Sequence, residues 1–231
     1  MRLDKFIATH SEASRSLAKV AILSGRAKVN GVVVKDQGLK VKSEDEIIVN
    51  GHLITESGEV YIALYKPEDV LSSTGDDEED DTVIDLVDGF THKELHIAGR
   101  LDKDATGLVL LTSDGKWSHR VTSPKFSCEK VYHVVLIDPI DQEVVEIFAE
   151  GLYLRGEEKR TLPAKLELLG EREGRLTITE GKYHQVKRMF GAIGNKVLGL
   201  KRENIGVVTL RDLEPGEYYE LDDSQVQSFL K

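Results

Sequence analysis

A short polar stretch near the middle of the chain carries the residues best suited to chemistry. Residues 99–115 read Gly-Arg-Leu-Asp-Lys-Asp-Ala-Thr-Gly-Leu-Val-Leu-Leu-Thr-Ser-Asp-Gly, so Arg100, Asp102 and Asp104 come just before an apolar strand at 108–111. Such a turn can hold a carboxylate rigidly at a cleft, as a nucleophile or a base. The same residues also fit a surface turn in which Asp102 caps the backbone and pairs with Arg100. Composition alone favours the surface turn, so the order of the residues has to decide.

Two later stretches supply further polar residues in a recognisable order. Residues 128–135 read Cys-Glu-Lys-Val-Tyr-His-Val-Val, and residues 180–190 read Glu-Gly-Lys-Tyr-His-Gln-Val-Lys-Arg-Met-Phe. The three motifs together resemble the RsuA/RluA group of RNA pseudouridine synthases, and the form of the last one resembles the RsuA branch. The resemblance extends from about Tyr61 to the C-terminus, which makes chance a poor explanation.

The resemblance implies an enzyme that isomerises uridine in RNA to pseudouridine with neither cofactor nor metal. Asp102 matches the family's essential aspartate, Tyr132 its active-site tyrosine and Lys187 a basic partner of the aspartate. Asp102 then acts either as a nucleophile at C1′ or as a base that opens a glycal route. Lys187 keeps the carboxylate ionised by proximity, and Tyr132 stacks on the base.

The third motif also begins a basic stretch that fits RNA. A uridine in folded RNA is reached only after it flips out of the stack, and six basic residues with no acid lie between positions 182 and 202. Local stripes of this kind decide where phosphates dock. Arg100 has the alternative role of holding its turn, and His184 that of orienting the motif helix. The residues expected to hold the displaced strand are Arg100, Lys182, His184, Gln185, Arg188, Lys201 and Arg202.

The net charge of −10 argues against a nucleic-acid partner until its distribution is considered. Residues 1–58 carry nine Lys/Arg against seven Asp/Glu, whereas the rest of the chain carries 22 against 34 and so has a net charge of −12. Six consecutive acids at 76–81 account for half of that excess and are typical of an exposed loop. We therefore expect a basic cleft on an otherwise acidic body.

The first 58 residues predict a module of two helices followed by strands. Ser14 fits the N-cap of a helix that turns Leu17, Ala18, Ala21 and Ile22 inward, and Asn30-Gly31 predicts a tight hairpin. The pattern resembles the S4 RNA-binding domain, which implies a basic RNA face, although an ordinary solvated face has the same charges. The residues of that face are Arg2, Lys5, Arg15, Lys19, Arg26 and Lys28.

The remaining residues, 59–231, predict a catalytic domain of the α+β class. Strand-like segments lie at 60–65, 108–111, 130–136, 164–168 and 175–179, and helical ones at 116–121, 141–150 and 183–193. Because strands and helices do not alternate strictly, we expect a mixed, largely antiparallel sheet flanked by helices, with a central RNA-binding cleft. The charged segment 151–161 is expected to be solvated surface.

Several classes of protein are disfavoured by composition. No apolar run approaches the ~20 residues that cross a bilayer, so the chain is expected to be cytoplasmic and without a membrane partner. We also expect it to be a monomer. The single cysteine, Cys128, excludes an intramolecular disulfide and a Cys-rich zinc site and is expected to be a small hydrophobe in the core. His96 and His119 lack the spacing of metal ligands, so no metal is assigned.

The sequence thus predicts a synthase of the RsuA branch that modifies one uridine of 16S (small-subunit) rRNA. A synthase for 23S rRNA and a catalytically silent ribosome-assembly factor are the alternatives. A glycosidase using Asp102 and Asp104 is weaker, because side chains two residues apart on an extended turn point to opposite sides. Three positions depart from the branch pattern and put local RNA contacts in doubt: Tyr65, Asp69 and Lys182.

Overall fold

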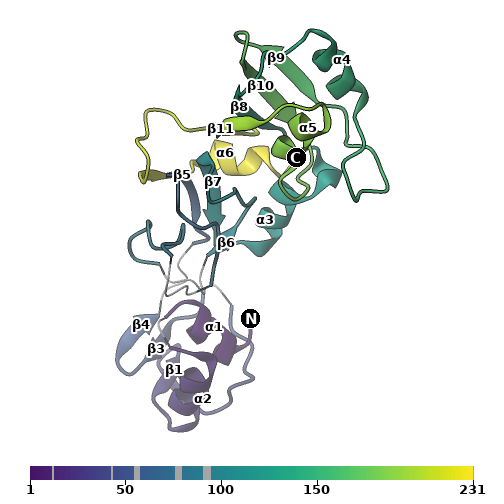
Figure 1. The fold of residues 1–231 in the computed structure, drawn as a ribbon. Coiled ribbons are helices and arrows are strands. Elements are labelled where there is room, and N and C mark those ends of the chain that lie inside the picture. The colour runs from purple at the N-terminus through teal and green to yellow at the C-terminus, as the bar shows by residue number, and fades with distance from the viewer. Residues whose placement is uncertain (12, 43, 55–57, 76–79, 91–94, 231) are drawn as a thin grey trace. The chain divides into compact units, whose positions relative to one another are not determined.

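The computed structural model describes residues 1–11, 13–42, 44–54, 58–75, 80–90 and 95–230. The chain divides into two compact units, residues 1–58 and 59–231 (Figure 1). Each unit has a hydrophobic core of its own. In the described part of the chain, no helix is long and apolar enough to cross a membrane.

The first unit packs two helices against a small antiparallel sheet. Helix α1 spans Leu3–Thr9 and α2 spans Arg15–Leu23. The sheet has the order β2-β1-β3-β4, in which β1 is Ala27–Val29, β2 Val32–Val34, β3 Ile47–Val49 and β4 His52–Ile54. The unit therefore follows the expected order of helix, helix and strands.

Local sequence signals set the turns and caps of this unit. The Ser14 side chain accepts a hydrogen bond from the backbone N–H of Leu17 at 3.3 Å, which satisfies an N–H that the helix leaves unpaired. Asn30 and Gly31 have φ of +51° and +80°, as the tight turn between β1 and β2 requires. The expected inward position of Leu17 is wrong. The buried face of α2 consists of Ala18, Ala21 and Ile22, and Leu17 is 60% exposed beside it.

The second unit is built on a mixed sheet, which has nine strands among the described residues. Seven of them follow the order β13-β5-β7-β11-β8-β10-β9, and the other two, β6 and β12, pair with β7 and β11. Every pair is antiparallel except β7 with β11. The α+β class and the largely antiparallel sheet are thus confirmed. The strands are β5 Tyr61–Lys66, β6 His96–Ile97, β7 Thr106–Thr112, β8 Lys130–Leu136, β9 Lys165–Leu168, β10 Glu173–Ile178, β11 Val197–Ile205, β12 Val208–Thr209 and β13 Tyr218–Glu220.

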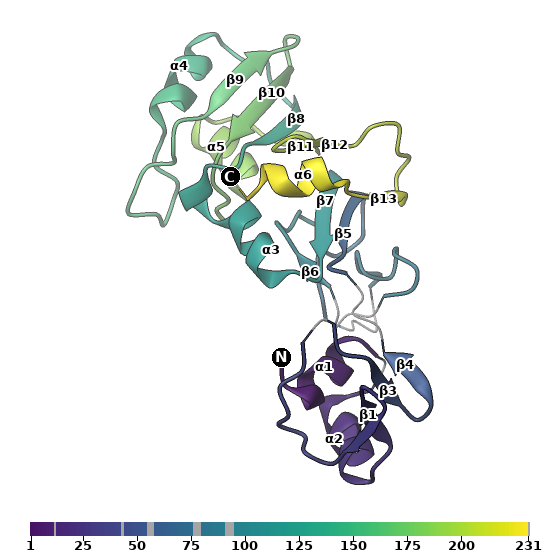
Figure 2. The same cartoon turned by 180° about the vertical axis from the view of Figure 1, so that it is seen from behind.

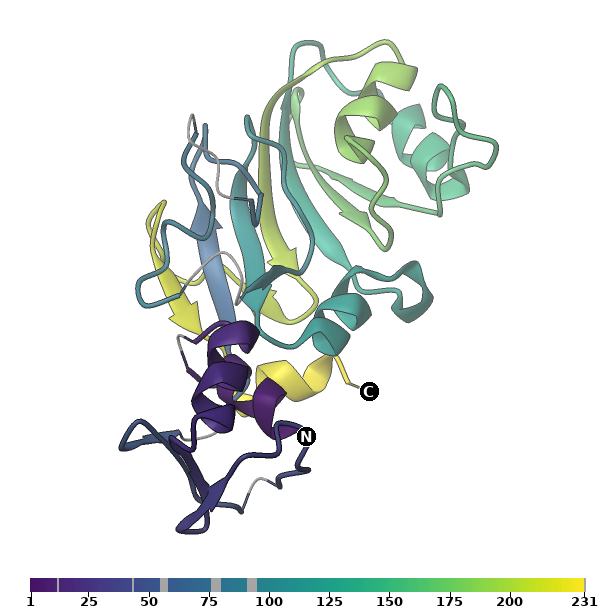
Figure 3. The ribbon, with the colours of Figure 1, turned by 90° about the horizontal axis from the view of Figure 1, so that it is seen from below.

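Helices cover both faces of this sheet. On one face α4 (Glu143–Glu150) and α5 (Gln185–Ala192) meet through Phe148 and Phe190, whose rings lie 5.0 Å apart (Figure 3). On the other face α3 (Gly115–Thr122) meets α6 (Asp223–Ser228) and the residue after it, where Trp117 lies 5.0 Å from Phe229 (Figure 2). Cys128 packs half-buried beside this second cluster, and burial raises the pKa of its thiol. The 3₁₀ turn Pro124–Phe126 follows α3.

The central strand β11 was not expected from the sequence. It lies between β7 and β8 and includes the end of the basic stretch, with Lys201 and Arg202. Gly107 makes its close approach to β7 possible, because a Cβ at that residue would stand 2.3 Å from the carbonyl oxygen of Arg202. Its φ of +115° also lies in the region that favours glycine. The approach places the turn before β7 next to the middle of β11.

Candidate active site

The turn that carries Asp102 is held by hydrogen bonds from several segments. The N–H of Leu101 donates to the hydroxyl of buried Ser72 at 3.1 Å, and the N–H of Ala105 donates to the carbonyl of Asp102 at 3.1 Å. The fully buried ammonium of Lys66 donates to the Lys103 carbonyl at 3.1 Å, and burial lowers its pKa to about 8. The turn is therefore built into the domain, so that the Asp102 carboxylate is positioned before a substrate arrives.

Arg202 is the strongest of these supports. Its side chain is 1% exposed, and its guanidinium donates to the carbonyls of Leu108 (2.7 Å), Gly99 (2.7 Å) and Arg100 (3.2 Å). It also donates to the hydroxyl of Tyr132 at 3.3 Å. Arg202 also lines the cavity described below, and its contact with RNA stays a prediction. Its fork of donors is used inside the protein to fix the catalytic turn.

Two basic side chains from the third motif meet the carboxylate of Asp102. The Nζ of Lys187 lies 3.2 Å from Oδ2, and the Nε2 of His184 lies 3.4 Å from Oδ1. Lys187 also binds Asp104, which lowers the pKa of that carboxyl. Burial lowers the pKa of Lys187, but its hydrogen bonds to Asp104 and Asp102 outweigh this effect and the net pKa is raised. Lys187 is thus a firm cation beside the carboxylate.

A cavity of about 580 Å³ opens above this group of charges. Its volume lies in the range of cavities that enclose small ligands. Tyr132 forms part of its wall and is 7% exposed, with its ring toward the cavity lining and its hydroxyl bound by Arg202. The wall also includes apolar side chains that suit a pyrimidine, among them Leu71, Ile97, Leu101, Ile178, Val186 and Leu200.

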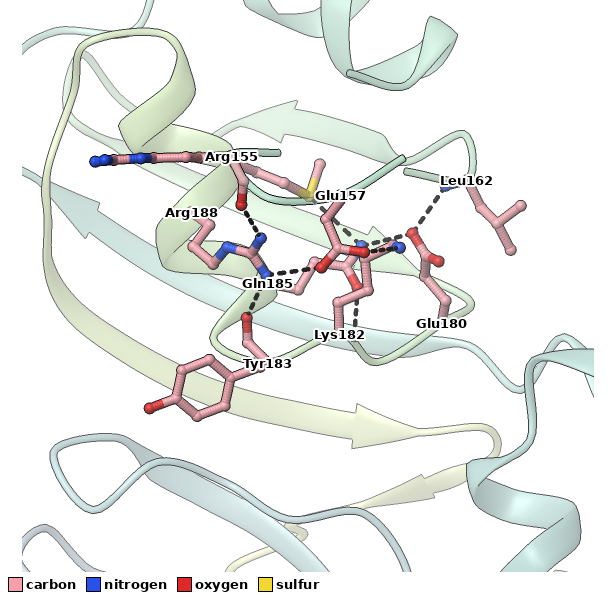
Figure 4. A network of polar contacts seen from close by, with 9 residues as sticks. Arg155, Glu157, Leu162, Glu180, Lys182, Tyr183, Gln185 and Arg188 are labelled. Atoms are coloured by element: carbon pink, nitrogen blue, oxygen red, sulfur yellow. Dashed lines mark hydrogen bonds and ion pairs between the residues drawn. The ribbon is translucent and has the colours of Figure 1, made fainter. Parts of the chain in front are cut away.

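A network of polar contacts ties the segment 151–161 to the third motif (Figure 4). Glu157 accepts from the Nζ of Lys182 at 2.7 Å and from Nη1 of Arg188 at 3.2 Å. Arg188 also donates to the carbonyls of Tyr183 (2.9 Å) and Arg155 (2.8 Å). The segment is therefore docked through Glu157 rather than being only solvated surface.

Gln185 and Glu180 form the buried part of the same network. The amide of Gln185 donates to Glu180 at 2.8 Å and its oxygen accepts from the N–H of Lys182 at 2.8 Å, while Glu180 also accepts from the N–H of Leu162. Gln185 is 4% exposed. The polar atoms of Gln185 are thus used within the protein, and its contact with RNA stays a prediction.

Lys201, which was expected beside the other RNA contacts, does not line the cavity. It precedes Arg202 on β11, so its side chain leaves the opposite face of the sheet. Its ammonium lies 4.8 Å from the ring centroid of Tyr65, on the side of α3 and α6. Lys201 therefore does not share the cavity with Asp102, and Tyr65 has a structural partner there.

The other sequence-predicted contacts are placed as follows. Arg100 is exposed at the cavity mouth, and His184 stacks on Tyr183 with ring centroids 3.8 Å apart. Lys182 lines the cavity and Arg188 does not, and both are paired with Glu157. In the first unit, Arg2 and Arg15 are bound to the buried carboxylate of Asp4. Lys5, Arg26 and Lys28 are exposed, and Lys19 is half-buried.

Sequence reasoning missed Ser72, Glu157 and the support given by Lys66 and Asp69. The Lys-Pro pair at 66–67 was the available signal for Lys66. Asp69 has φ of +63°, and its N–H donates to the Lys103 carbonyl at 3.0 Å, so an aspartate adopts the left-handed turn here. No cluster of three or more metal-ligating side chains occurs in the portion of the chain that the structure describes.

Comparison with known proteins identifies the family to which this geometry belongs. The family model for RNA pseudouridylate synthase matches residues 60–192, and the S4 domain model matches residues 1–47. The chain belongs to the RNA pseudouridylate synthase family. It is an RNA-modifying isomerase with an S4 domain, as its motifs predicted.

Full-length relatives agree with this assignment. The ribosomal small subunit pseudouridine synthase A of Vibrio cholerae is 50% identical over all of both chains, and that of Escherichia coli is 46% identical over 99% of each. A crystal structure of a pseudouridylate synthase is 47% identical, covers 99% of both chains and has a TM-score of 0.71. The synthase and these relatives thus share both units.

Proposed function

We propose that this synthase converts one uridine of small-subunit ribosomal RNA to pseudouridine. The observation that carries the proposal is the Asp102 carboxylate at the cavity, bound by Lys187 at 3.2 Å and approached by His184 at 3.4 Å. The full-length relatives named as small-subunit enzymes support this substrate over large-subunit rRNA. A silent binding protein has no need of a carboxylate held by several separate segments.

The chemistry follows from the residues around the cavity. The target uridine flips out of its stack into the cavity, where Tyr132 supports the base. Asp102 attacks C1′, or removes a ribose proton to open a glycal, so that the C1′–N1 bond breaks. The detached uracil rotates within the apolar walls and C5 joins C1′. On the nucleophilic route this breaks the bond between Asp102 and C1′, and on the glycal route the ribose regains the proton that Asp102 removed. Loss of the proton at C5 to solvent completes the product, and the Tyr132 hydroxyl is our candidate for relaying it.

The decisive experiment replaces Asp102 by asparagine. Asp102→Asn keeps the shape of the side chain but removes both nucleophile and base, so we expect no pseudouridine in a small-subunit rRNA fragment and RNA affinity within about threefold of wild type. Mass spectrometry of the digested RNA measures the product. Asp104→Asn is the matched control and should still turn over, because Asp102 and its contact with Lys187 remain. Turnover by Asp102→Asn would overturn the proposal.

The choice of RNA needs a separate measurement. We propose that the synthase acts in the cytoplasm, as a monomer, on small-subunit rRNA or on an assembly intermediate. Mapping pseudouridine in both rRNAs from cells that lack the protein should reveal one missing site in the small-subunit RNA. A missing site in the large-subunit RNA instead would redirect the assignment.

A further inference from the structure

A second cavity lies beside the catalytic turn and has a different chemistry. Its volume is about 310 Å³, and its wall carries the hydroxyls of four Ser and Thr residues, the imidazole of His96 and the guanidinium of Arg100. Among the described residues, the lining contains no carboxylate and no Phe, Tyr or Trp ring on which a base could stack. A cavity that offers hydrogen-bond donors and a positive charge, but no aromatic ring for a base, suits a phosphate group. The lining residues are Ser72, Ser73, Thr74, His96, Ile97, Arg100 and Ser118.

The two cavities adjoin along the turn that carries Asp102. Ser72, Ile97 and Arg100 line both of them. A nucleotide whose base enters the larger cavity is joined to its neighbours by phosphodiesters on either side. The smaller cavity is therefore placed where a flanking phosphodiester of the flipped uridine can be held.

The hydroxyls are set up to donate. Ser72 accepts from the N–H of Leu101 at 3.1 Å, and Ser73 accepts from the N–H of Gly75 at 3.0 Å. A hydroxyl has one donor in addition to its acceptor sites. Because the protein uses acceptor sites of these two oxygens, their O–H groups can point to an anion. Ser72 is 4% exposed, so its bond to Leu101 also fixes this wall relative to Asp102.

Side chains, rather than the end of helix α3, supply the binding groups. His96, on strand β6, lies beside the first residue of α3: its Nε2 would be 3.5 Å from a Cβ added to Gly115. The first N–H groups of that helix are already used, since Asp114 accepts from Lys116 at 2.8 Å and Trp117 at 3.1 Å. In either neutral tautomer or as a cation, His96 keeps at least one N–H donor.

We propose that this cavity is a phosphate subsite, in which His96, Arg100 and the hydroxyls of Ser73, Thr74 and Ser118 hold a phosphodiester that flanks the target uridine. The inference rests on the proposed function of the larger cavity. The role of the phosphate subsite is to fix the ribose over Asp102, because phosphate contacts set the register of a nucleic acid on a protein.

The test combines a protein variant with a neutral linkage in the RNA. Methylphosphonate replaces the phosphodiester on the 5′ or the 3′ side of the target uridine in an rRNA fragment. For the wild-type synthase, we expect one of the two substitutions to raise KM about tenfold, an effect typical of one charge-assisted hydrogen-bond site. The variant His96→Gln with Ser118→Ala should raise KM for the unmodified RNA by a similar factor and should not respond further to that substitution.

Matched controls separate the possible outcomes. His119→Gln changes the residue next to Ser118 on α3, which does not line the cavity, so this variant should respond to methylphosphonate as wild type does. Thr74→Val removes a hydroxyl donor from a different segment. Like the variant with His96→Gln and Ser118→Ala, it should lose the rise in KM that methylphosphonate causes. If the effects of the RNA and protein changes simply multiply, or if neither linkage matters, the subsite is overturned. Failure of the wild type to modify the unmodified RNA would instead overturn the proposed function.

Discussion

Tyr132 lines the larger cavity and also contacts Arg202, which holds the turn that carries Asp102. Its ring lines the cavity, while its hydroxyl accepts from buried Arg202 at 3.3 Å. Arg202 keeps its three carbonyl acceptors when that hydroxyl is removed. The turn should therefore survive the loss of the hydroxyl, so that the chemical role of Tyr132 can be measured separately from its structural role.

We predict that Tyr132→Phe retains RNA binding but forms product much more slowly, since the ring remains and the proton acceptor is removed. Tyr132→Ala should also weaken binding, because base stacking contributes roughly 1–3 kcal/mol. Single-turnover rates and equilibrium binding measure the two effects. Equal activity of both variants would mean that Tyr132 serves only to pack the core.

Asp4 is the corresponding charged support in the S4 unit. Its side chain is fully buried, and Arg2 and Arg15 lie 3.0 and 3.3 Å from its oxygens. The hydrogen bond from Arg2 lowers the pKa of Asp4 to about 2, against the opposing effect of burial. Because the folded pKa lies below the unfolded one, the ionised carboxylate stabilises the unit above about pH 4.

This stabilisation should be lost as the pH falls from about 4 to about 2. Asp4→Asn should lower the stability of the unit by about 1–3 kcal/mol at neutral pH, because the charged hydrogen bonds disappear, and should remove part of its acid sensitivity. Hydrogen exchange of amides in residues 1–58 measures both effects. Glu44→Gln is the control, since its exposed pair with Lys42 at 3.4 Å contributes little. An unchanged acid profile in Asp4→Asn would contradict the assignment.

At the scale of elements, the segment 151–161 positions the start of helix α5. Glu157 binds both Lys182 and Arg188 (Figure 4). The stretch between these two residues carries His184 and Lys187, which meet Asp102. These hydrogen bonds lower the pKa of Glu157, with that from Lys182 the larger cause. These contacts of the segment are thus with the residues around the start of α5, and none of them is with the Asp102 carboxylate.

We predict that Glu157→Gln lowers kcat more than it changes KM, because the turn before α5 loses its charged anchor and Lys187 becomes less well positioned. Glu158→Gln, one residue along the same segment, is the control and should behave as wild type. Steady-state kinetics with the rRNA fragment separate kcat from KM, and a thermal melt monitors folding. If Glu157→Gln lowers the melting temperature but leaves kcat unchanged, the network stabilises the fold without positioning the site.

At the scale of the whole molecule, a chain of net charge −10 has to bind an anion through local groups. Two of the expected RNA contacts have partners within the protein: Arg202 binds backbone carbonyls, and Lys201 lies on the ring of Tyr65. Three others are paired with acids, namely Lys182, Lys187 and Arg188. Arg100 remains at the cavity mouth, together with the exposed basic residues of the S4 unit. The acids at 76–79, expected in an exposed loop, lie outside the described residues.

We predict that removal of residues 1–58 weakens binding of structured rRNA more than binding of a short single strand. The reason is that a tethered second contact adds effective concentration only where the RNA can reach both units. The slope of log affinity against log salt should also become shallower, by about 0.7 for each phosphate of a single-stranded segment that the shortened protein no longer neutralises. Filter binding at several salt concentrations measures both quantities. An unchanged preference for structured rRNA would contradict a docking role for the S4 unit.

The sequence by itself determined the class of the fold, and it singled out Asp102, Tyr132 and Lys187, which the fold brings together around one cavity. These features depend on local order: an Asn-Gly pair sets its own turn, and β8 alternates buried and half-buried side chains along Lys130–Leu136. Strand and cap signals act over a few residues, so they can be read without the rest of the chain. The resemblance to the synthases rested on three such local strings.

Only the tertiary structure decided which of the polar residues are buried and bonded within the protein. Arg202 is buried because β11 enters the sheet between β7 and β8, and the same strand turns Lys201 to the other face. Glu157 reaches the third motif from a segment 25 residues before Lys182. A charged residue in a sequence carries no label for burial, because its burial depends on partners that only distant parts of the chain supply.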